Sequence, residues 1–164
     1  MTQSEQFLME AFAGESQANR RYLAFAQQAE KEGYPQVAKL FSAAAEAETV
    51  HAHAHLRALK GVRSTVENLK EAISGETHEF NIMYPAMIGT AIVEGNKEAE
   101  RSFKYANEVE KAHVDLFEKA LANLDKQAEV DYCVCSVCGY TWEIESPEEC
   151  QLCGTKAMHF FKVE

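Results

Sequence analysis

The stretch EAETVHAHAHL, from Glu46 to Leu56, places three histidines at alternate positions, with a glutamate three residues before the first of them. Alternation is typical of a strand, but the flanking residues are rich in Ala, Glu, Lys, Leu and Gln, which favour a helix. On a helix, at about 100° per residue, His51 and His55 lie about 40° apart, whereas His53 points some 200° away from His51. We therefore expect His51 to be the metal ligand, His53 to lie outside the site, and His55 to pack beside it.

The Glu-x-x-His spacing occurs twice. Glu48 precedes His51 by three residues, and Glu110 precedes His113 by three residues. Residues three apart on a helix share a face, so each pair presents a carboxylate and an imidazole side by side. A single such pair is usually a solvated surface feature of a glutamate-rich helix, whereas two in register indicate a shared site.

Upstream glutamates repeat as well. The stretch AFAGE, which ends at Glu15, matches AISGE, which ends at Glu76. The interval from Glu15 to Glu48 is 33 residues, and the interval from Glu76 to Glu110 is 34 residues. We interpret the helical region as a duplicated helical hairpin whose polar residues are repeated in register.

The second copy contains one extra residue, in a segment that includes HEFNIMYP and therefore Pro85. An added residue inside a helix is commonly accommodated as a π-bulge, and such bulges favour functional sites. The sequence therefore predicts a local distortion of the third helix near Glu79 to Pro85.

Helix boundaries follow from the turn residues. EGYP ends the first helix, with Gly33 at its C′ position and Pro35 in the first turn of the next helix. STVE, from Ser64, has the spacing of a capping box and begins the third helix, and EGN, which ends at Asn96, separates the third from the fourth. The expected helices cover about residues 4–31, 35–60, 64–93 and 97–124.

The composition changes after residue 125. Residues 126–131 are polar and are expected to form a linker, and residues 132–164 contain all five cysteines and strand-like pieces such as YTWEI and HFFKV. We expect an all-α four-helix bundle over residues 1–125 and a small β-rich metal module over residues 132–164. Tyr140 and Trp142 are expected to fill the core of that module.

Charge and hydropathy exclude several classes of protein. The formal net charge is −10, which argues against binding to nucleic acid or to an anionic membrane surface. No apolar run reaches the roughly 18 residues that span a bilayer, and the N-terminal residues lack the pattern of a secretory signal. The cysteines are clustered with metal-binding spacing rather than scattered as in a disulfide framework, which favours the reducing cytoplasm.

Carboxylates dominate the predicted helical site. Burying so many of them without cations costs several kcal/mol per charge, and two divalent or trivalent ions remove that cost. A glutamate from each of two helices, with Glu-x-x-His from each of the other two, is the donor set of carboxylate-bridged di-iron bundles. Such ligands also accept manganese and zinc, so they leave the metal open. The candidate ligands are Glu15, Glu48, His51, Glu76, Glu79, Glu110 and His113.

The cysteines form a second candidate site with the pattern C-x2-C-x11-C-x2-C, made by Cys135, Cys138, Cys150 and Cys153. Each C-x-x-C turn presents two thiolates to one ion, and the glycine that follows allows a tight turn. Four thiolates suit either structural zinc or a single iron that changes oxidation state. Cys133 lies outside the pattern and is expected to be a spare thiol, with an alternative metal ligand and an oxidation-prone thiol as the two other interpretations.

Over essentially its whole length the sequence resembles the rubrerythrin family. The resemblance rests on AFAGESQANRRY, the first Glu-x-x-His, GETHEFNIMYP, the second Glu-x-x-His, and the rubredoxin-like CSVCGY…CQLCG, in this order. It implies a ferritin-like bundle with a rubredoxin-like C-terminal domain. It also implies that Glu79 and His51 exchange as ligands of one iron on reduction, and that Tyr22 and Tyr84 hydrogen-bond to the carboxylate ligands. The implied di-iron ligands are Glu15, Glu48, Glu76, Glu79, Glu110 and His113, and the implied mononuclear iron ligands are the four cysteines of the pattern.

The resemblance further implies a cytoplasmic peroxidase of oxidative-stress defence that reduces hydrogen peroxide to water. Electrons would pass from rubredoxin or a nicotinamide-dependent reductase through the Fe(Cys)4 centre to the di-iron site. The chain has neither a G-x-G-x-x-G motif nor a P-loop, so we expect the reductase to be a separate protein. Family members are homodimers or larger, and in some of them the subunits exchange helices. Two alternatives are ferritin-like iron oxidation and storage, and a zinc-stabilised scaffold without redox activity.

Overall fold

The computed structural model describes residues 1–126, 129–143 and 147–163. It divides the chain into two compact units, Met1–Arg63 and Ser64–Glu164. The first is a helical hairpin, and the second is a helical hairpin that carries the cysteine-rich module. The predicted fold class, a helical bundle protein with a small C-terminal β-rich metal module, is confirmed at the level of these elements.

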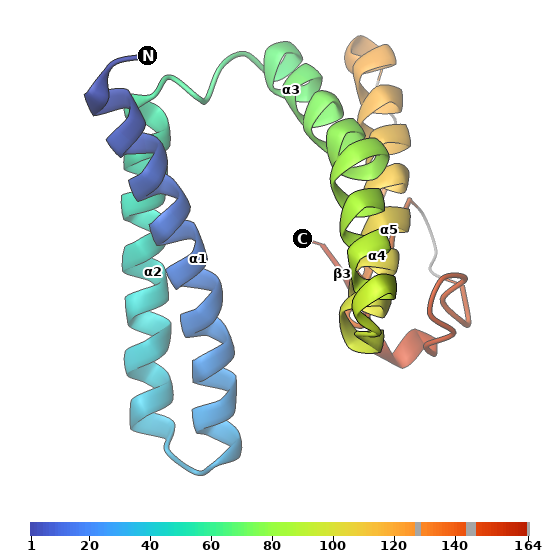
Figure 1. Cartoon of the computed structure of the whole chain (residues 1–164), viewed down its shortest axis with the longest axis horizontal. Helices are drawn as coiled ribbons and strands as arrows, with labels where there is room; N and C mark the ends of the chain where they lie inside the picture. The colour runs from blue at the N-terminus through green and yellow to red at the C-terminus, as the bar shows by residue number, and fades with distance from the viewer. Residues whose placement is uncertain (127–128, 144–146, 164) are drawn as a thin grey trace. The chain divides into compact units, whose positions relative to one another are not determined.

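The first unit consists of α1 (Gln3–Lys31) and α2 (Pro35–Ala58), which lie antiparallel along their length (Figure 1, blue to cyan). Gly33, with φ of 81°, ends α1, and Pro35 begins α2, as predicted. Small side chains between the helices allow close approach. Six alanines are buried in the hairpin: Ala18, Ala26, Ala29, Ala38, Ala45 and Ala52.

The second unit pairs α5 (Lys97–Ala122) with a long helical segment made of α3 (Thr65–His78), a π-helical turn η1 (Glu79–Met83) and α4 (Tyr84–Glu94). Figure 1 shows this segment in green beside α5. The predicted capping box is present, because the Ser64 hydroxyl accepts from the Glu67 backbone and the Glu67 carboxylate accepts from the Ser64 backbone.

The predicted distortion of the third helix is confirmed. The Tyr84 N–H donates to the Glu79 carbonyl, five residues back, so one extra residue is contained in the turn. Pro85 follows at once and has no N–H to donate, which removes one α-helical hydrogen bond at the same place. The turn thus restores the register between the two copies of the repeat.

The module contains three short strands, β1 (Tyr132–Cys135), β2 (Thr141–Glu143) and β3 (Phe160–Lys162), in the antiparallel order β2-β1-β3. β2 and β3 lie within the two strand-like pieces of the sequence, whereas β1 was not predicted. Two 3-10 turns, η2 (Leu124–Lys126) and η3 (Ala157–His159), precede β1 and β3. Residues 127–128 of the predicted linker lie outside the described residues, and the domain boundaries at 125 and 132 stay a prediction.

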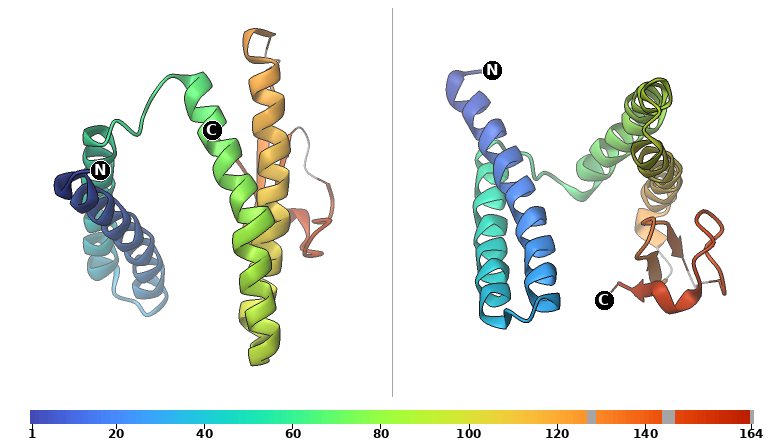
Figure 2. Two further views of the ribbon diagram at one scale, coloured as in Figure 1. Left: turned by 45° about the horizontal axis from the view of Figure 1, so that its top comes forward. Right: turned by 60° about the horizontal axis from the view of Figure 1, so that its bottom comes forward.

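Aromatic rings fill the module as expected. The ring centroid of Trp142 lies 5.0 Å from that of Tyr140 and 4.8 Å from that of Phe160. Because neighbouring residues of a strand point to opposite faces, Thr141 and Glu143 lie on the face of β2 opposite Trp142. That second face is directed at α5, because Thr141 contacts His113 and Glu143 contacts Lys119. Figure 2 shows the module beside the helical hairpin of its own unit.

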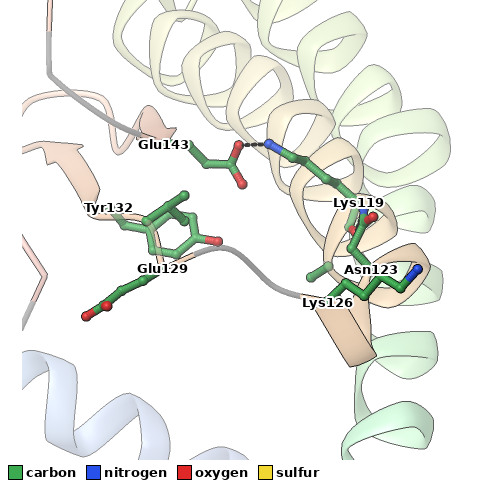
Figure 3. Close-up of a pocket in the computed structure, with 8 residues that line it drawn as sticks. Lys119, Asn123, Lys126, Glu129, Tyr132 and Glu143 are labelled. Carbon is green, nitrogen blue, oxygen red and sulfur yellow. Dashed lines mark hydrogen bonds and ion pairs between the residues drawn. The ribbon is translucent and has the colours of Figure 1, made fainter.

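The module is fixed to its own helical hairpin. Lys119 of α5 and Glu143 of β2 form an ion pair, drawn as a dashed line in Figure 3. Beside it lies a pocket of about 430 Å³ between the end of α5 and β1, lined in part by Asn123, Lys126 and Tyr132. The second unit is therefore a helical hairpin with the cysteine module packed against α5.

Candidate metal centres

The first hairpin brings three of the predicted ligands together. Glu15 of α1 and Glu48 and His51 of α2 each offer a donor atom within 4.8 Å of the others. His51 Nδ1 lies 3.0 Å from Glu48 Oε2. The pKa of Glu48 is lowered by its hydrogen bond to His51 and then by one to Glu15.

The second hairpin contains the matching group. Glu76 of α3 and Glu110 and His113 of α5 offer donor atoms within 4.8 Å of one another. His113 Nδ1 lies 2.8 Å from Glu110 Oε2 and 3.9 Å from Glu76 Oε1. Each of the two hairpins thus contains two carboxylates and one imidazole in the same arrangement.

The pKa values of the three residues in the second group indicate that the group favours added positive charge. Burial, followed by a hydrogen bond to Glu110, raises the pKa of Glu76 to about 7. The hydrogen bond with Glu110 raises the pKa of His113. Burial acts to raise the pKa of Glu110, yet the hydrogen bonds to His113 and Glu76 outweigh it, and the net shift is downward. Protons bound between these side chains offset the negative charge of the carboxylates. A metal cation at the same place would offset it in the same way.

Tyrosines occupy equivalent places in the two hairpins. The ring centroids of Tyr22 and Phe41 lie 6.1 Å apart, and those of Tyr84 and Phe103 lie 6.3 Å apart. The interplanar angles of these pairs are 33° and 39°. Tyr22 follows its glutamate by seven residues and Tyr84 by eight, so the π-turn keeps the second tyrosine on the matching face.

The neighbouring carboxylates also affect the pKa of Tyr84. Burial raises its pKa, and the negative charges of Glu110, Glu79 and Glu76 raise it further. Its phenol therefore remains protonated at neutral pH, close to the predicted ligands. The predicted hydrogen bonds from Tyr22 and Tyr84 to carboxylates stay predictions.

Glu79 stands apart from both groups of three. It is the first residue of the π-turn and is half-buried, and its charge acts on Glu76 and on His113. His53 is exposed and His55 is half-buried, and neither belongs to a ligand group among the described residues. Each group of three lies within one compact unit.

The four predicted cysteines form the third group. Cys135 Sγ lies 3.7 Å from Cys153 Sγ, and Cys138 Sγ lies 3.6 Å from Cys150 Sγ. Four thiolates about 2.3 Å from one tetrahedral ion lie about 3.8 Å from one another, so the cluster has the size of a tetrathiolate metal site. Cys133, in β1, does not belong to this group.

The two C-x-x-C turns have the same backbone. Gly139 and Gly154 have φ of 81° and 72°, in the left-handed region that glycine enters without strain. The N–H of each glycine donates at 2.8 Å to the carbonyl of the first cysteine of its turn. Burial raises the pKa of Cys138, whereas for Cys153 burial is outweighed by the combined hydrogen bonds to Thr155, Cys150 and Cys138, which bring its pKa to about 7.

Two threonines near the metal sites were not predicted. Thr155 Oγ1 lies 3.2 Å from Cys153 Sγ, and Thr141 Oγ1 lies 3.4 Å from His113 Nε2. Thr155 could have been found from its position next to Gly154. No sequence signal places Thr141, because its contact with α5 depends on how the module packs.

Comparison with known proteins agrees with these groups. The family model described as Rubrerythrin matches residues 6–121. The chain belongs to the rubrerythrin family. Rubrerythrin-2 of Clostridium acetobutylicum is 38% identical over 171 residues, covering 94% of this chain and 93% of that protein. Nigerythrin of Nitratidesulfovibrio vulgaris is 32% identical, covering 89% of this chain and 79% of its own length.

A solved structure described as the fully reduced, all-ferrous state of nigerythrin is similar to this rubrerythrin-family chain with a TM-score of 0.61 and 30% identity, covering 99% of this chain and 88% of that one. Membership, together with the donor groups, identifies the chain as an oxidoreductase of oxidative-stress defence that has ligands for a di-iron site and for a mononuclear Fe(Cys)4 site. Among the described residues, no helix is long and apolar enough to cross a membrane.

Proposed function

We propose that the protein is a peroxidase that reduces hydrogen peroxide to water. The observation that carries the proposal is the presence, in one chain, of two matching carboxylate–histidine groups and a four-cysteine group. A storage site needs the first two groups but has no use for an electron-transfer thiolate centre. We propose that the metal ligands are the seven carboxylate and imidazole residues and the four cysteines predicted from the sequence.

The reaction consumes two electrons and two protons for each peroxide and yields two waters. When bound, a ferrous pair supplies the two electrons that break the O–O bond. The residues of the chain hold the ions together, balance their charge and retain protons nearby. Tyr84, whose phenol stays protonated beside Glu76 and Glu110, keeps a proton at the carboxylates.

We propose that His51 and Glu79 are the ligands that exchange. His51 has an exposed side chain, 57% accessible, and Glu79 lies on a π-turn outside the group of three formed by its neighbours. Both features leave the side chains room to move without disturbing the helices that hold Glu48, Glu76 and Glu110.

Electrons for each cycle must come from another protein, because the sequence contains no nucleotide-binding motif. We propose that rubredoxin or a nicotinamide-dependent reductase reduces the Fe(Cys)4 centre, which in turn would return the oxidised di-iron pair to the ferrous state. We place the protein in the cytoplasm, where the four thiols stay reduced.

We also propose that the protein is a homodimer or a larger homo-oligomer. Each hairpin exposes large apolar side chains, such as Phe7 and Leu40 in the first unit and Ile82 and Ile92 in the second. Exposed large apolar side chains in both hairpins favour association. Because the connection between the hairpins is short, exchange of hairpins between subunits is the arrangement we test below.

Stopped-flow mixing of the fully reduced, iron-loaded protein with hydrogen peroxide or dioxygen tests the proposed activity. We expect peroxide to re-oxidise both iron centres much faster than dioxygen does. Equal rates, or faster reaction with dioxygen, would overturn the proposal and favour the ferritin-like alternative. A colourless protein that binds only zinc after expression in its native host would favour the scaffold alternative.

A further inference from the structure

The duplication makes His51 and His113 equivalent in sequence, but their surroundings differ. Both use Nδ1 to contact a glutamate three residues earlier, at 3.0 and 2.8 Å. The His51 side chain is 57% exposed, and among the described residues its polar contact is Glu48 alone. The His113 side chain is 28% exposed, and its second nitrogen meets the cysteine module.

Strand β2 brings the module to His113. Thr141 and Glu143 lie on the same face of the strand and point at α5, while Trp142 points into the module. Glu143 pairs with Lys119, six residues beyond His113 on the same helix. With about 1.5 Å of rise per residue, His113 and Lys119 are about 9 Å apart along α5, whereas Thr141 and Glu143 are about 6.6 Å apart along the strand. The long side chains of Lys119 and Glu143 bridge the difference. The ion pair therefore holds Thr141 at the imidazole.

The hydroxyl of Thr141 has one hydrogen to donate and lone pairs with which to accept. Thr141 Oγ1 donates to the Gly139 carbonyl at 3.2 Å, which leaves a lone pair for the Nε2–H of His113 at 3.4 Å. An imidazole whose Nε2 carries the hydrogen has its Nδ1 lone pair free for a metal. Nδ1 is also the nitrogen that faces Glu110 and Glu76.

We propose that Thr141 is a positioning residue that holds His113 as a permanent metal ligand with Nδ1 directed at the metal. Its equivalent in the first hairpin, His51, has no such partner among the described residues and is the histidine that moves. The module thus makes the two metal positions of a duplicated site unequal. This inference rests on the proposed di-metal site and names the residue that makes its two halves different.

The hydroxyl contact also links the two kinds of metal site within one chain. Gly139, which accepts from Thr141, directly follows Cys138 of the four-cysteine group. His113 is thus connected to the cysteine turn through one side chain and one backbone carbonyl. Loss of the Thr141 hydroxyl removes this connection while leaving every proposed metal ligand in place.

The test compares Thr141→Val, which keeps the shape and strand preference but lacks the hydroxyl, with Thr141→Ser, which restores it. Thr90→Val is the matched control, because Thr90 donates only to the Ala86 carbonyl within α4. All variants are studied as the full chain with zinc, which is diamagnetic, after the four-cysteine site has been filled. Nitrogen-15 NMR then reports the tautomer of His113, and chelator competition reports zinc affinity at the helical site.

We expect Thr141→Val to weaken zinc binding at the helical site by about 10- to 100-fold, the usual effect of removing the partner of a metal-bound histidine, and to shift the Nε2 signal of His113. Thr141→Ser and Thr90→Val should retain the native Nε2 signal of His113. Their zinc affinity at the helical site should stay within about threefold of that of the parent protein. Native affinity and an unchanged His113 signal in Thr141→Val would overturn the inference. Filling of the four-cysteine site and the signal of Trp142 show whether the module is folded in each variant.

Neither measurement depends on peroxide. A protein that fails as a peroxidase can still pass this test, and a true peroxidase can fail it, so the two proposals are separately falsifiable.

Discussion

At the scale of single residues, the raised pKa of Glu76 allows the most direct predictions. Its pKa of about 7 lies above the ordinary value of 4.5, chiefly because the carboxyl is partly buried beside Glu110. His113, held by Glu110, also has a raised pKa. Both residues bind protons more tightly in the folded protein than in the unfolded chain, and both are proposed metal ligands.

This predicts the pH dependence of the metal-free protein. Since the folded state keeps protons that the unfolded chain has lost, the free energy of unfolding should fall as the pH rises from about 5 to 7. Glu48 and Glu110 have lowered pKa values, so they change the free energy of unfolding only below about pH 4.5, outside this window. Urea unfolding at several pH values, with chelator and reductant present, measures the trend.

Glu76→Gln provides the control for this prediction. The amide cannot titrate, so the decline between pH 5 and 7 should become shallower in this variant, leaving the contribution of His113. A parent protein that becomes more stable over this window would contradict the assignment of protons to Glu76 and His113.

Metal should compete with the same protons. We expect zinc affinity at the Glu76–Glu110–His113 group to increase as the pH rises from 5 to 7, by about tenfold per pH unit for each proton displaced. Isothermal titration in buffers of different ionisation enthalpy counts the protons released. Release of none at pH 6 would contradict the prediction.

At the scale of elements, the helices were largely predictable because their signals are local. Gly33, Pro35 and the Ser64–Glu67 capping box are turn and cap residues whose effect needs no distant contact. The π-turn was predictable from the count of residues between repeated glutamates, although no periodicity within the segment shows it. Helix ends differed by about two residues, as at Ala58, where α2 stops short of the predicted Lys60.

The capping box of α3 is open to a direct test. Ser64→Ala should lower the free energy of unfolding by about 1 kcal/mol, because the hydroxyl satisfies the Glu67 N–H. Chemical denaturation measures the change. Ser74→Ala, the same substitution at an exposed position within α3, is the control and should be neutral or slightly stabilising. Equal effects of the two substitutions would show that the cap contributes nothing.

The π-turn has a structural prediction of its own. Deleting Asn81, an exposed residue of η1, makes the second copy equal in length to the first and should give a regular α-helix. Helical content and stability should be retained, whereas the number of metal ions bound should fall because Glu79 is no longer presented by the turn. Equilibrium dialysis with zinc measures this number. Unchanged metal binding would show that the extra residue has no role at the site.

At the scale of the whole molecule, the sequence names the candidate ligands but not all the residues that contact them. Glu15, Glu48 and the cysteines follow from repetition and spacing, which are properties of the chain alone. The contact of Thr141 with His113 depends on the packing of β2 against α5, which no local pattern encodes. The assignment of all eleven ligands to bound metal stays a prediction.

Exchange of hairpins between subunits is tested by mixing two inactive chains. Glu48→Gln disables the first hairpin and Glu110→Gln disables the second, so each variant alone should lose most of its peroxidase activity. In a mixed dimer with exchanged hairpins, one bundle receives two native hairpins and activity returns. If each bundle forms within one chain, mixing after unfolding and refolding restores nothing.

Anaerobic titration of the fully reduced, iron-loaded protein with hydrogen peroxide tests the central claim most directly. Three ferrous ions per chain hold three electrons and each peroxide takes two, so complete oxidation should require about 1.5 equivalents of peroxide per chain. Appearance of the red Fe(Cys)4 colour follows the mononuclear centre, and Mössbauer spectra follow all three ions. An endpoint near 0.5 equivalents, with the Fe(Cys)4 centre alone oxidised, would contradict the account.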